Sequence, residues 1–432
     1  MKKTYRILLI LMFLIGVCSL VEDNVIKVSA DTNKVNKAKY TVMVYLDGSS
    51  LESDFELASE DLKEMLKIGS SEEVNIVMET GGAKKWHTPA INPETNQRWI
   101  IQKDSLQLIE DVGFKNMGEA STLSDFMVWG MEKYPAEKYA VILWGHGSGS
   151  VYGYGHDERF GLDPLTLPEL EKTFKDTYEK TRKKLEIVAF DACLVTNLET
   201  LSYINKYANY IVGSEDMVPG HGLNYIYTFE KLLNKPNMNG AELGRIIADG
   251  FYKQAIENEE DDDIAMSVID LSKVKPITKA FDDIARLLKV DVLNDDKFQS
   301  ILTARRNVEE YGKMDGPEDS EMVDLGDLAK QMYSQYPFYS RRIMSAVDQA
   351  VVYNVKSPWK KATGICLFFP LGDRERFDEK LNLYKNNNFS KDYYDFLEIF
   401  IANLKNNQFM NVSNESLNTN IVKNFDVTYT GM

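Results

Sequence analysis

The sequence predicts an α/β protein with a mostly parallel central sheet and helices on both faces. Short apolar runs rich in β-branched residues alternate, through the first half of the chain, with amphipathic stretches of helical spacing. The chain has 432 residues, of which 44% are hydrophobic and 27% charged, so it can bury a large core and carry further elements around it. The alternation predicts strand–helix–strand units, whose strands pair in parallel.

The first strand is predicted at Thr41–Leu46, an apolar β-branched run that an Asp-Gly turn follows. Ser49 and Glu52 form a capping box, which predicts a helix that Gly69 ends. The pattern continues with strands expected at 74–78, 139–144, 185–190 and 210–213, a hairpin at 98–101 and 106–109, and helices at 123–134, 166–183 and from Cys193 to about 206.

Beyond residue 234 the chain becomes helix-rich. Two further strands, Ala265–Ile269 and Ile365–Phe369, are expected in the same sheet, and helices are expected at 241–256, 274–288, 298–311, 325–333 and 341–353. The segment from 406 is rich in Asn and lacks an apolar stripe, so we expect a loose tail there. The predicted parts are a leader (1–30), a core (38–234), a helix-rich part that adds strands to the core (235–405) and the tail (406–432).

The N-terminus has the pattern of an export signal. A basic start precedes the apolar run Ile7–Val21, which with 15 residues is short for a membrane span. Small residues end at Ala30, after which we expect cleavage and secretion of the mature protein. Two alternatives stay open: an uncleaved N-terminal anchor, and a lipoprotein at Cys18, which Val17 disfavours because a small residue normally precedes the lipidated Cys.

The charge balance is strongly acidic, with a formal net charge of −16. Residues 1–30 hold four bases and two acids, so their removal leaves about −18. This balance disfavours nucleic acid and anionic membranes as partners and favours solubility outside the cell. We expect a monomer whose partners are proteins or peptides.

Of the three cysteines, Cys18 leaves with the leader, and Cys193 and Cys366 remain. Exported proteins usually pair their cysteines in disulfides, but the settings of these two differ. Cys366 lies inside an apolar run at 364–369, which predicts a buried strand and a small core thiol.

Cys193 and His146 follow two apolar strands in the same way. Val141–Trp144 leads into Gly-His-Gly, and Ile187–Phe190 leads into Asp-Ala-Cys. Because ligands bind outside the carboxyl ends of the strands in an open α/β sheet, both side chains are predicted to lie at the edge where a site forms. Each residue alone has a plain structural alternative: a polar residue in a glycine loop for His146, and a small buried hydrophobe for Cys193.

This pair of residues predicts thiol chemistry. The thiolate is the nucleophilic form, and a helix that begins at Cys193 would favour it. A neighbouring His takes and returns a proton during acyl transfer. The backbone N–H groups of Cys193 and Gly147 are candidates for binding the oxyanion.

Four segments resemble the clostripain family of cysteine peptidases, in the family's order and over about residues 40 to 370. They are the Val-Met-Val-Tyr-Leu-Asp-Gly run at 42–48, Trp-Gly-His-Gly at 144–147, Asp-Ala-Cys-Leu at 191–194 and Gly-Ser-Glu-Asp-Met-Val-Pro-Gly at 213–220. The resemblance implies a caspase-like sheet sandwich, a dyad of His146 and Cys193 without an obligatory third member, and cleavage after Arg or Lys. It also implies synthesis as a zymogen in some members and calcium dependence in some.

Carried over residue by residue, the resemblance makes Asp191 the acid that lines the pocket for a basic side chain. The alternative for Asp191 is a capping or hinge carboxylate. The Pro-Gly-His-Gly turn at 219–222 borders the same pocket, so His221 is a candidate for substrate binding, although an acid would better complement a cation. His156 and His87 lie in polar segments and are expected at the surface.

The glycine-rich segment 147–163 is expected to be a mobile loop that lies across the cleft. It carries one basic residue, Arg159. Because the resemblance implies self-cleavage after a basic residue in this region, Arg159–Phe160 is a predicted activation site. The alternative is an exposed Arg that is never cut.

No cofactor is expected to be required, and calcium is left open. The acidic runs at 257–263 and 315–327 lack the spacing of a calcium loop, so a solvated acidic face is the preferred interpretation. Four histidines without paired spacing argue against a metal enzyme. Two rival functions stay open: a peptidase of the same fold that selects Asn or Asp, and a secreted binding or adhesion protein without catalysis.

Overall fold

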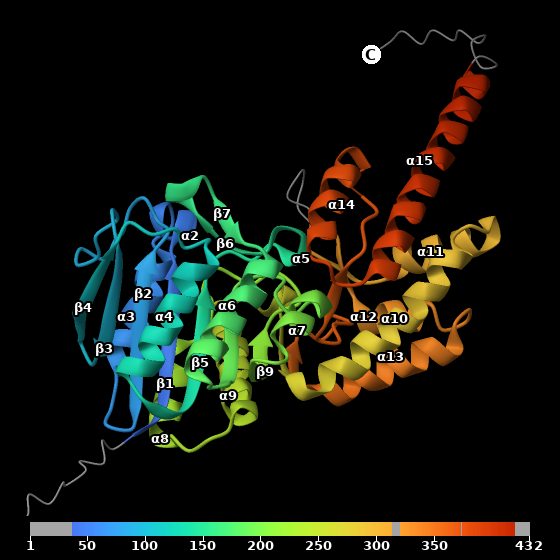
Figure 1. Cartoon of the computed structure of the whole chain (residues 1–432). Helices are drawn as coiled ribbons and strands as arrows, with labels where there is room; N and C mark the ends of the chain where they lie inside the picture. The colour runs from blue at the N-terminus through green and yellow to red at the C-terminus, as the bar shows by residue number, and fades with distance from the viewer. Residues whose placement is uncertain (1–36, 313–319, 373, 420–432) are drawn as a thin grey trace, which may run out of the picture. The chain divides into compact units, whose positions relative to one another are not determined.

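A nine-stranded sheet forms the centre of the protein (Figure 1). The computed structural model describes residues 37–312, 320–372 and 374–419. The five middle strands are parallel and lie in the order β9 (Ala208–Gly213), β8 (Leu185–Asp191), β5 (Ala136–Trp144), β1 (Ala38–Asp47) and β2 (Val74–Gly81). Antiparallel strands extend both edges: β10 (Ala265–Asp270) and β13 (Val351–Lys356) beside β9, and β3 (Asn96–Gln102) and β4 (Ser105–Gly113) beside β2.

Helices cover both faces of the sheet because successive strand residues point to opposite sides. In β1, Met43 and Tyr45 belong to one hydrophobic cluster, and Val42 and Val44 belong to the other. The first cluster includes residues of α4 (Ala120–Lys133), α6 (Leu167–Thr181) and α7 (Leu198–Ile204); the second includes residues of α3 (Leu57–Ile68), α8 (Tyr225–Asn234) and α9 (Gly240–Glu257). This arrangement confirms the predicted α/β class.

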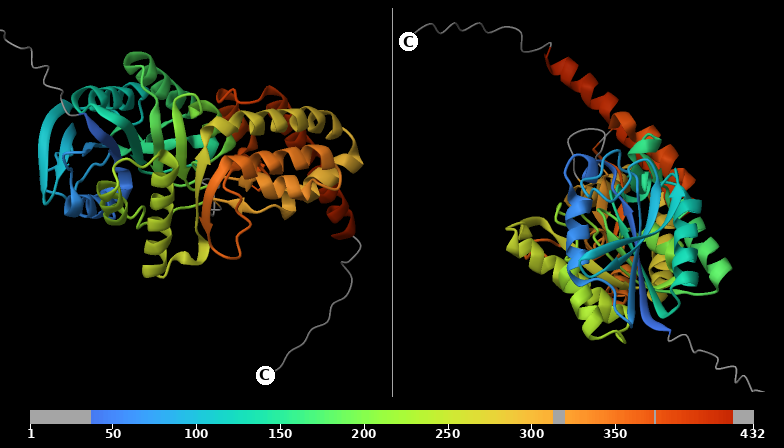
Figure 2. Two further views of the ribbon diagram at one scale, coloured as in Figure 1. Left: turned by 90° about the horizontal axis from the view of Figure 1, so that it is seen from below. Right: turned by 90° about the vertical axis from the view of Figure 1, so that its left-hand side faces the viewer.

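The C-terminal half packs onto the first of these clusters. Its helices are α10 (Val274–Asp291), α11 (Asp295–Asn307), α12 (Leu325–Gln331), α13 (Pro337–Ala350), α14 (Phe377–Asn386) and α15 (Lys391–Thr419). They surround a small sheet of β11 (Glu310–Tyr311), β12 (Met322–Asp324) and β14 (Cys366–Phe368). The yellow and orange helices α10 and α13 lie side by side in Figures 1 and 2. The residues on the two sides of position 234 thus share a core.

Four predictions about the C-terminal half were wrong. The helix expected at 298–311 ends at Asn307, and Glu310–Tyr311 is a strand of the small sheet. The strand at 365–369 pairs with β12 in the small sheet and not with the central sheet. The helix expected to reach Tyr353 ends at Ala350, where a β-branched run continues as edge strand β13. The tail expected from residue 406 is helical to Thr419, and residues 420–432 lie outside the described part.

Two local predictions in the first half also differ from the structure. Ser49 does not cap a helix; instead Glu52 accepts hydrogen bonds from the backbone N–H and hydroxyl of Ser59, at 2.8 and 2.7 Å. The segment 147–163 is not a featureless loop. It contains the short helix α5 (Gly149–Tyr152) and the hairpin of β6 (Tyr154–Asp157) and β7 (Asp163–Leu165).

The predicted leader, its cleavage after Ala30 and the alternatives at the N-terminus lie outside the described residues. Among the residues that are described, no helix combines the length and the hydropathy needed to cross a membrane.

Candidate active site

The pairing of β5 with β8 places His146 and Cys193 at equivalent positions. In this parallel pair Trp144 lies opposite Asp191, and each of the two residues follows two positions later. The N–H of Gly145 donates a hydrogen bond to the carbonyl of Asp191 at 3.1 Å, so the two chains stay paired as they leave the sheet. The structure therefore brings the two segments together at the carboxyl edge, as the sequence predicts.

Gly147 lies directly against the backbone of Cys193. A Cβ atom at position 147 would lie 1.9 Å from the carbonyl oxygen of Cys193 and 2.8 Å from its nitrogen, so only glycine fits. Within the described residues, neither the N–H of Gly147 nor that of Cys193 donates a hydrogen bond. Both N–H groups are therefore available to another acceptor where the two segments touch, which keeps them as candidates for an oxyanion site.

His146 is held by side chains from two other segments. Its Nε2 lies 3.0 Å from the hydroxyl of Ser50, in the short helix α2 (Ser49–Ser53) that follows β1. Its ring stacks on that of His156 in β6, with centroids 5.5 Å apart. The prediction that His156 is a surface residue was wrong, because the residue is half-buried and its ring stacks on His146. Burial, and then the neighbouring His146, lower the pKa of His156 to about 4, so it is neutral at physiological pH.

Asp47, the last residue of β1, contacts the backbone of the segment that carries His156, and it is fully buried. Its Oδ2 accepts a hydrogen bond from the backbone N–H of His156 at 3.0 Å, so it ties the β6–β7 hairpin to the sheet. Burial, and then the nearby Asp157, raise the pKa of Asp47 to about 8. This carboxyl is therefore mostly protonated at neutral pH and adds little negative charge to the site.

The thiol of Cys193 accepts a hydrogen bond from the N–H of Val218 at 3.2 Å. Burial raises the pKa of Cys193 to about 11, although this hydrogen bond favours the thiolate. The expected help from a helix N-terminus was wrong, because α7 begins only at Leu198, after a turn capped by Asn197. The thiol is thus protonated in this conformation.

Asp191 lies at the end of β8 beneath the turn at 219–222. Its Oδ2 accepts hydrogen bonds from the N–H of Leu223 at 3.1 Å and from the hydroxyl of Tyr225 at 2.9 Å. The residue is 5% exposed, and burial raises its pKa to about 6 despite these hydrogen bonds. The carboxyl of Asp191 therefore anchors the turn, and when ionised it can also attract a cation.

A third buried carboxyl, Asp61 of α3, was not found from the sequence. It accepts a hydrogen bond from the indole N–H of Trp144 at 2.6 Å. Burial, and then the negative charge of Asp191, raise the pKa of Asp61 well above its usual range. Two buried acids therefore lie below the carboxyl ends of β5 and β8, and their mutual repulsion disfavours ionisation of both.

His221 lies in the turn, but its ring packs against α9 and the acidic segment beyond it. The ring centroid is 5.9 Å from that of Phe251, and Nδ1 contacts the carboxylate of Glu260. Among the described residues it forms no hydrogen bond with Asp191. Its role in substrate binding stays a prediction.

Arg159 lies in the one-turn helix between β6 and β7, and its side chain is 6% exposed. The guanidinium donates hydrogen bonds to the side chains of Asp157 and Asn96 and to the carbonyls of Pro93 and Lys115, and it lies 5.3 Å from the ring of Phe114. Phe160 is partly exposed and stacks on the same ring. The basic side chain of the predicted activation site is therefore bound within the protein and is not exposed to a peptidase.

The acidic run at 257–263 is mostly exposed, as the interpretation of a solvated face predicts, whereas the described acids of the run at 315–327 are buried. Glu260 pairs with His221, and Asp263 pairs with Lys360 at 2.6 Å. Glu321, Asp324 and Asp327 are buried: Glu321 pairs with Lys380, Asp324 caps α12, and Asp327 pairs with Lys361. In the parts of the chain that the structure describes, no three acidic, His or Cys side chains converge on a position for a metal ion.

The sequence profile of the clostripain family, peptidase family C11, matches residues 44–414. The chain belongs to the clostripain family. The resemblance carried by the four motifs is thereby confirmed, and the members of this family are cysteine peptidases. Clostripain from Hathewaya histolytica is 22% identical over 316 residues, with 60% of this chain and 58% of that protein covered, so the match spans less than two thirds of clostripain's length.

Solved structures share the fold of this clostripain-family chain. A secreted C11 cysteine protease from Bacteroides thetaiotaomicron, in complex with an irreversible peptide inhibitor, has 18% identity and a TM-score of 0.59, with 82% of this chain and all of that chain covered. An inactive zymogen C11 protease from Parabacteroides distasonis has 16% identity and a TM-score of 0.61, with coverages of 83% and 98%. The caspase-like arrangement that the resemblance implied is the arrangement of these proteases.

Gly147→Ala should lower both activity and stability, because the added methyl group collides with backbone that cannot move aside cheaply. We expect a loss of about 1–3 kcal/mol in the free energy of unfolding, measured by urea denaturation. Gly220→Ala is the matched control, since a Cβ there meets only ordinary contacts at 3.5 Å and beyond. Equal stability of the two variants would contradict the close approach of the two segments.

Proposed function

We propose that this protein is a secreted cysteine endopeptidase that hydrolyses peptide bonds after Arg, and after Lys to a lesser degree. The observation that carries the proposal is the matched position of His146 and Cys193 at the ends of β5 and β8, with Gly147 against the Cys193 backbone. Family membership supplies the reaction class.

The site supports acyl transfer through a thioester. As Cys193 Sγ attacks the scissile carbonyl carbon, its proton passes to His146, and the N–H groups of Gly147 and Cys193 stabilise the oxyanion. His146 then protonates the leaving amine. Water, deprotonated by His146, hydrolyses the thioester and regenerates the thiol. Because Ser50 holds Nε2, we assign Nδ1 to the proton transfers.

The raised pKa of the thiol supports a resting precursor. With the pKa of Cys193 at about 11, the free thiolate is rare at neutral pH, so reaction depends on proton transfer to His146 during attack. A rearrangement that opens the site to water, or that moves His146 toward the thiol, would raise the reactivity. Activation by cleavage in the hairpin that carries His156 would do this, since His156 stacks on His146.

Asp191 supports the preference for a basic side chain. A carboxylate in a buried setting attracts a guanidinium strongly, and bidentate pairing favours Arg over Lys. The hydrogen bonds of Asp191 also leave room for the rival function, a peptidase that selects Asn or Asp. The Oδ2 of Asp191 is already bonded to Leu223 and Tyr225, so a purely structural Asp191 would leave the pocket free to select another residue, such as Asn.

Export by the N-terminal leader, with cleavage after Ala30, completes the proposal. The basic start, the short apolar run and the small residues before the cleavage site support it. The expected partners are proteins or peptides with basic residues, and the mature chain is expected to act as a monomer without a required cofactor.

Replacement of the nucleophile tests the proposed function. Cys193→Ala should abolish hydrolysis of Arg peptides by the activated protein, because no other group can form the thioester. Cys366→Ser is the matched control: Cys366 is fully buried in β14, so this variant should lose stability by about 1–3 kcal/mol but keep its activity. Hydrolysis by Cys193→Ala at the wild-type rate would contradict the mechanism.

The pH profile of Asp191→Asn tests the pocket. The pKa of Asp191 is raised to about 6, so the carboxyl is neutral below that pH and charged above it. The ratio of kcat/KM for an Arg peptide to that for a matched uncharged peptide should therefore rise as pH climbs through about 6. In Asp191→Asn the ratio should be flat and about 10- to 100-fold lower at pH 8.

The ratio removes pH effects that both peptides share, such as ionisation of the Cys193 thiol. A panel of Arg, Lys, Asn and Asp peptides separates the rival specificity in the same experiment. If Asp191→Asn has the same ratio of kcat/KM values as the wild type, Asp191 does not contribute to the selection of a basic substrate side chain.

Activation by cleavage at Arg159–Phe160 is tested by sequencing the N-termini of fragments from purified protein. Active wild-type protein should contain a fragment that begins at Phe160, whereas Cys193→Ala and Arg159→Gln should not. Because the guanidinium is held by several acceptors, we expect Asn96→Ala, which removes one of them, to be cut faster. Full activity of a chain that stays intact between His146 and Cys193 would exclude this activation route.

A further inference from the structure

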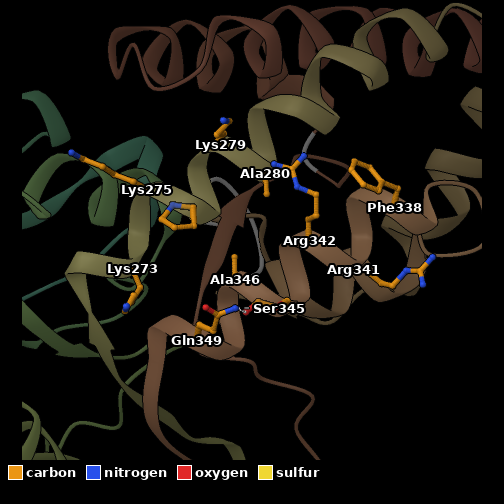
Figure 3. Close-up of a pocket in the computed structure, with 11 residues that line it drawn as sticks. Lys273, Lys275, Lys279, Ala280, Phe338, Arg341, Arg342, Ser345, Ala346 and Gln349 are labelled. Atoms are coloured by element: carbon orange, nitrogen blue, oxygen red, sulfur yellow. Dashed lines mark hydrogen bonds between the residues drawn. The ribbon is translucent and has the colours of Figure 1, made fainter.

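A groove of about 730 Å³ lies between the start of α10 and helix α13, in the C-terminal half of the chain (Figure 3). None of the residues that line it belongs to the candidate active site. Its size is that of a site for a small molecule or for a few side chains of a peptide.

The charge of this groove is opposite to that of the protein. Lysine and arginine residues number 50 in the whole chain against 66 acids, yet five of the eleven lining residues are cations and none is an acid. The five cations are Lys273, Lys275, Lys279, Arg341 and Arg342. Such a concentration of one sign of charge creates a local positive potential that attracts anions.

The lysines are the cations available to a partner. Arg342 pairs with Asp283 at 2.7 Å, and the guanidinium of Arg341 lies 5.7 Å from the ring of Tyr333. For Lys273, Lys275 and Lys279, by contrast, there is no ion pair within the described residues, and all three are exposed. Lys275 and Lys279 are one helical turn apart, so their Cβ atoms are about 6 Å apart.

The floor of the groove is apolar. Ala280 of α10 and Ala346 of α13 lie between the lysines on one side and the arginines on the other, and Pro276 adds apolar surface (Figure 3). At one end Phe338 is 61% exposed. One face of this ring lies 5.4 Å from the guanidinium of Arg342, and an exposed aromatic ring at the end of an apolar floor is the kind of anchor point that dominates protein–peptide interfaces.

We propose that this groove binds an acidic peptide segment of a partner protein, with carboxylates on the three lysines, one apolar side chain on Ala280 and Ala346, and another against Phe338. Charge complementarity selects the acidic residues, and the apolar floor selects a peptide over a polyphosphate or a sulfated glycan, which have no apolar groups to bury.

The experiment measures binding directly and does not depend on catalysis. The probe is a fluorescein-labelled synthetic peptide with Glu and Asp residues around a central Leu-Phe pair and without Lys or Arg, so that a peptidase selecting basic residues does not cut it. Fluorescence anisotropy with the full mature chain should show saturable binding that weakens as salt screens the lysines. Replacing Leu-Phe by Ser-Ser in the peptide, or Phe338→Ser in the protein, should weaken binding several-fold.

Charge reversal identifies the surface. Lys275→Glu with Lys279→Glu should weaken binding by about tenfold or more. Lys175→Glu with Lys180→Glu on α6 is the control, since these lysines are also exposed and the change in net charge is the same. The control pair should bind as the wild type does.

Three outcomes would overturn the proposal. The first is no binding by wild-type protein at low salt. The second is an equal loss of binding in the control pair, which would show attraction by net charge alone. The third is equal affinity for the Ser-Ser peptide and competition by polyphosphate at the same concentration, which would show a general polyanion site.

Discussion

The parallel pairing of β5 with β8 is the interaction on which the candidate active site depends. The register sets Trp144 opposite Asp191, and because both chains leave the sheet at the same level, His146 and Cys193 follow at equivalent positions. A slip of one residue would turn every side chain of one strand to the other face and separate the pair. The apolar residues of both strands, buried on both sides between helices, hold this register. Gly147 then allows the two segments to touch.

Burial controls the charges around this pair. The same packing that fixes the geometry raises the pKa of Cys193, Asp47 and Asp191 and lowers that of His156. At neutral pH the Cys193 thiol, the His156 imidazole and most of the Asp47 carboxyl are therefore uncharged in this conformation, and Asp191 is the buried carboxyl of this group that is mostly ionised. Groups that are kept neutral by burial ionise more easily when a substrate or a rearrangement changes their exposure to water. This behaviour fits a peptidase made as a precursor.

The sequence was sufficient for the parts of the site that lie on strands. Apolar β-branched runs predict β5 and β8, and the rule that sites form at the carboxyl ends of parallel strands places His146 and Cys193 together. It was insufficient where a contact joins segments far apart in the chain. Ser50, His156 and Asp61 reach the site through tertiary packing, and no local pattern marks them. The run at 365–369 was recognised as a strand, but strand propensity does not say which sheet a strand joins.

Labelling with an irreversible inhibitor tests the central claim most directly. The activated protein would be treated with a peptide that ends in an Arg chloromethyl ketone, and the modified residue would be found by peptide mapping with mass spectrometry. The account predicts one adduct, on Cys193 and not on Cys366, formed in step with the loss of activity and much more slowly in His146→Ala. Loss of activity with the label on another residue, or full labelling of Cys193 without loss of activity, would contradict it.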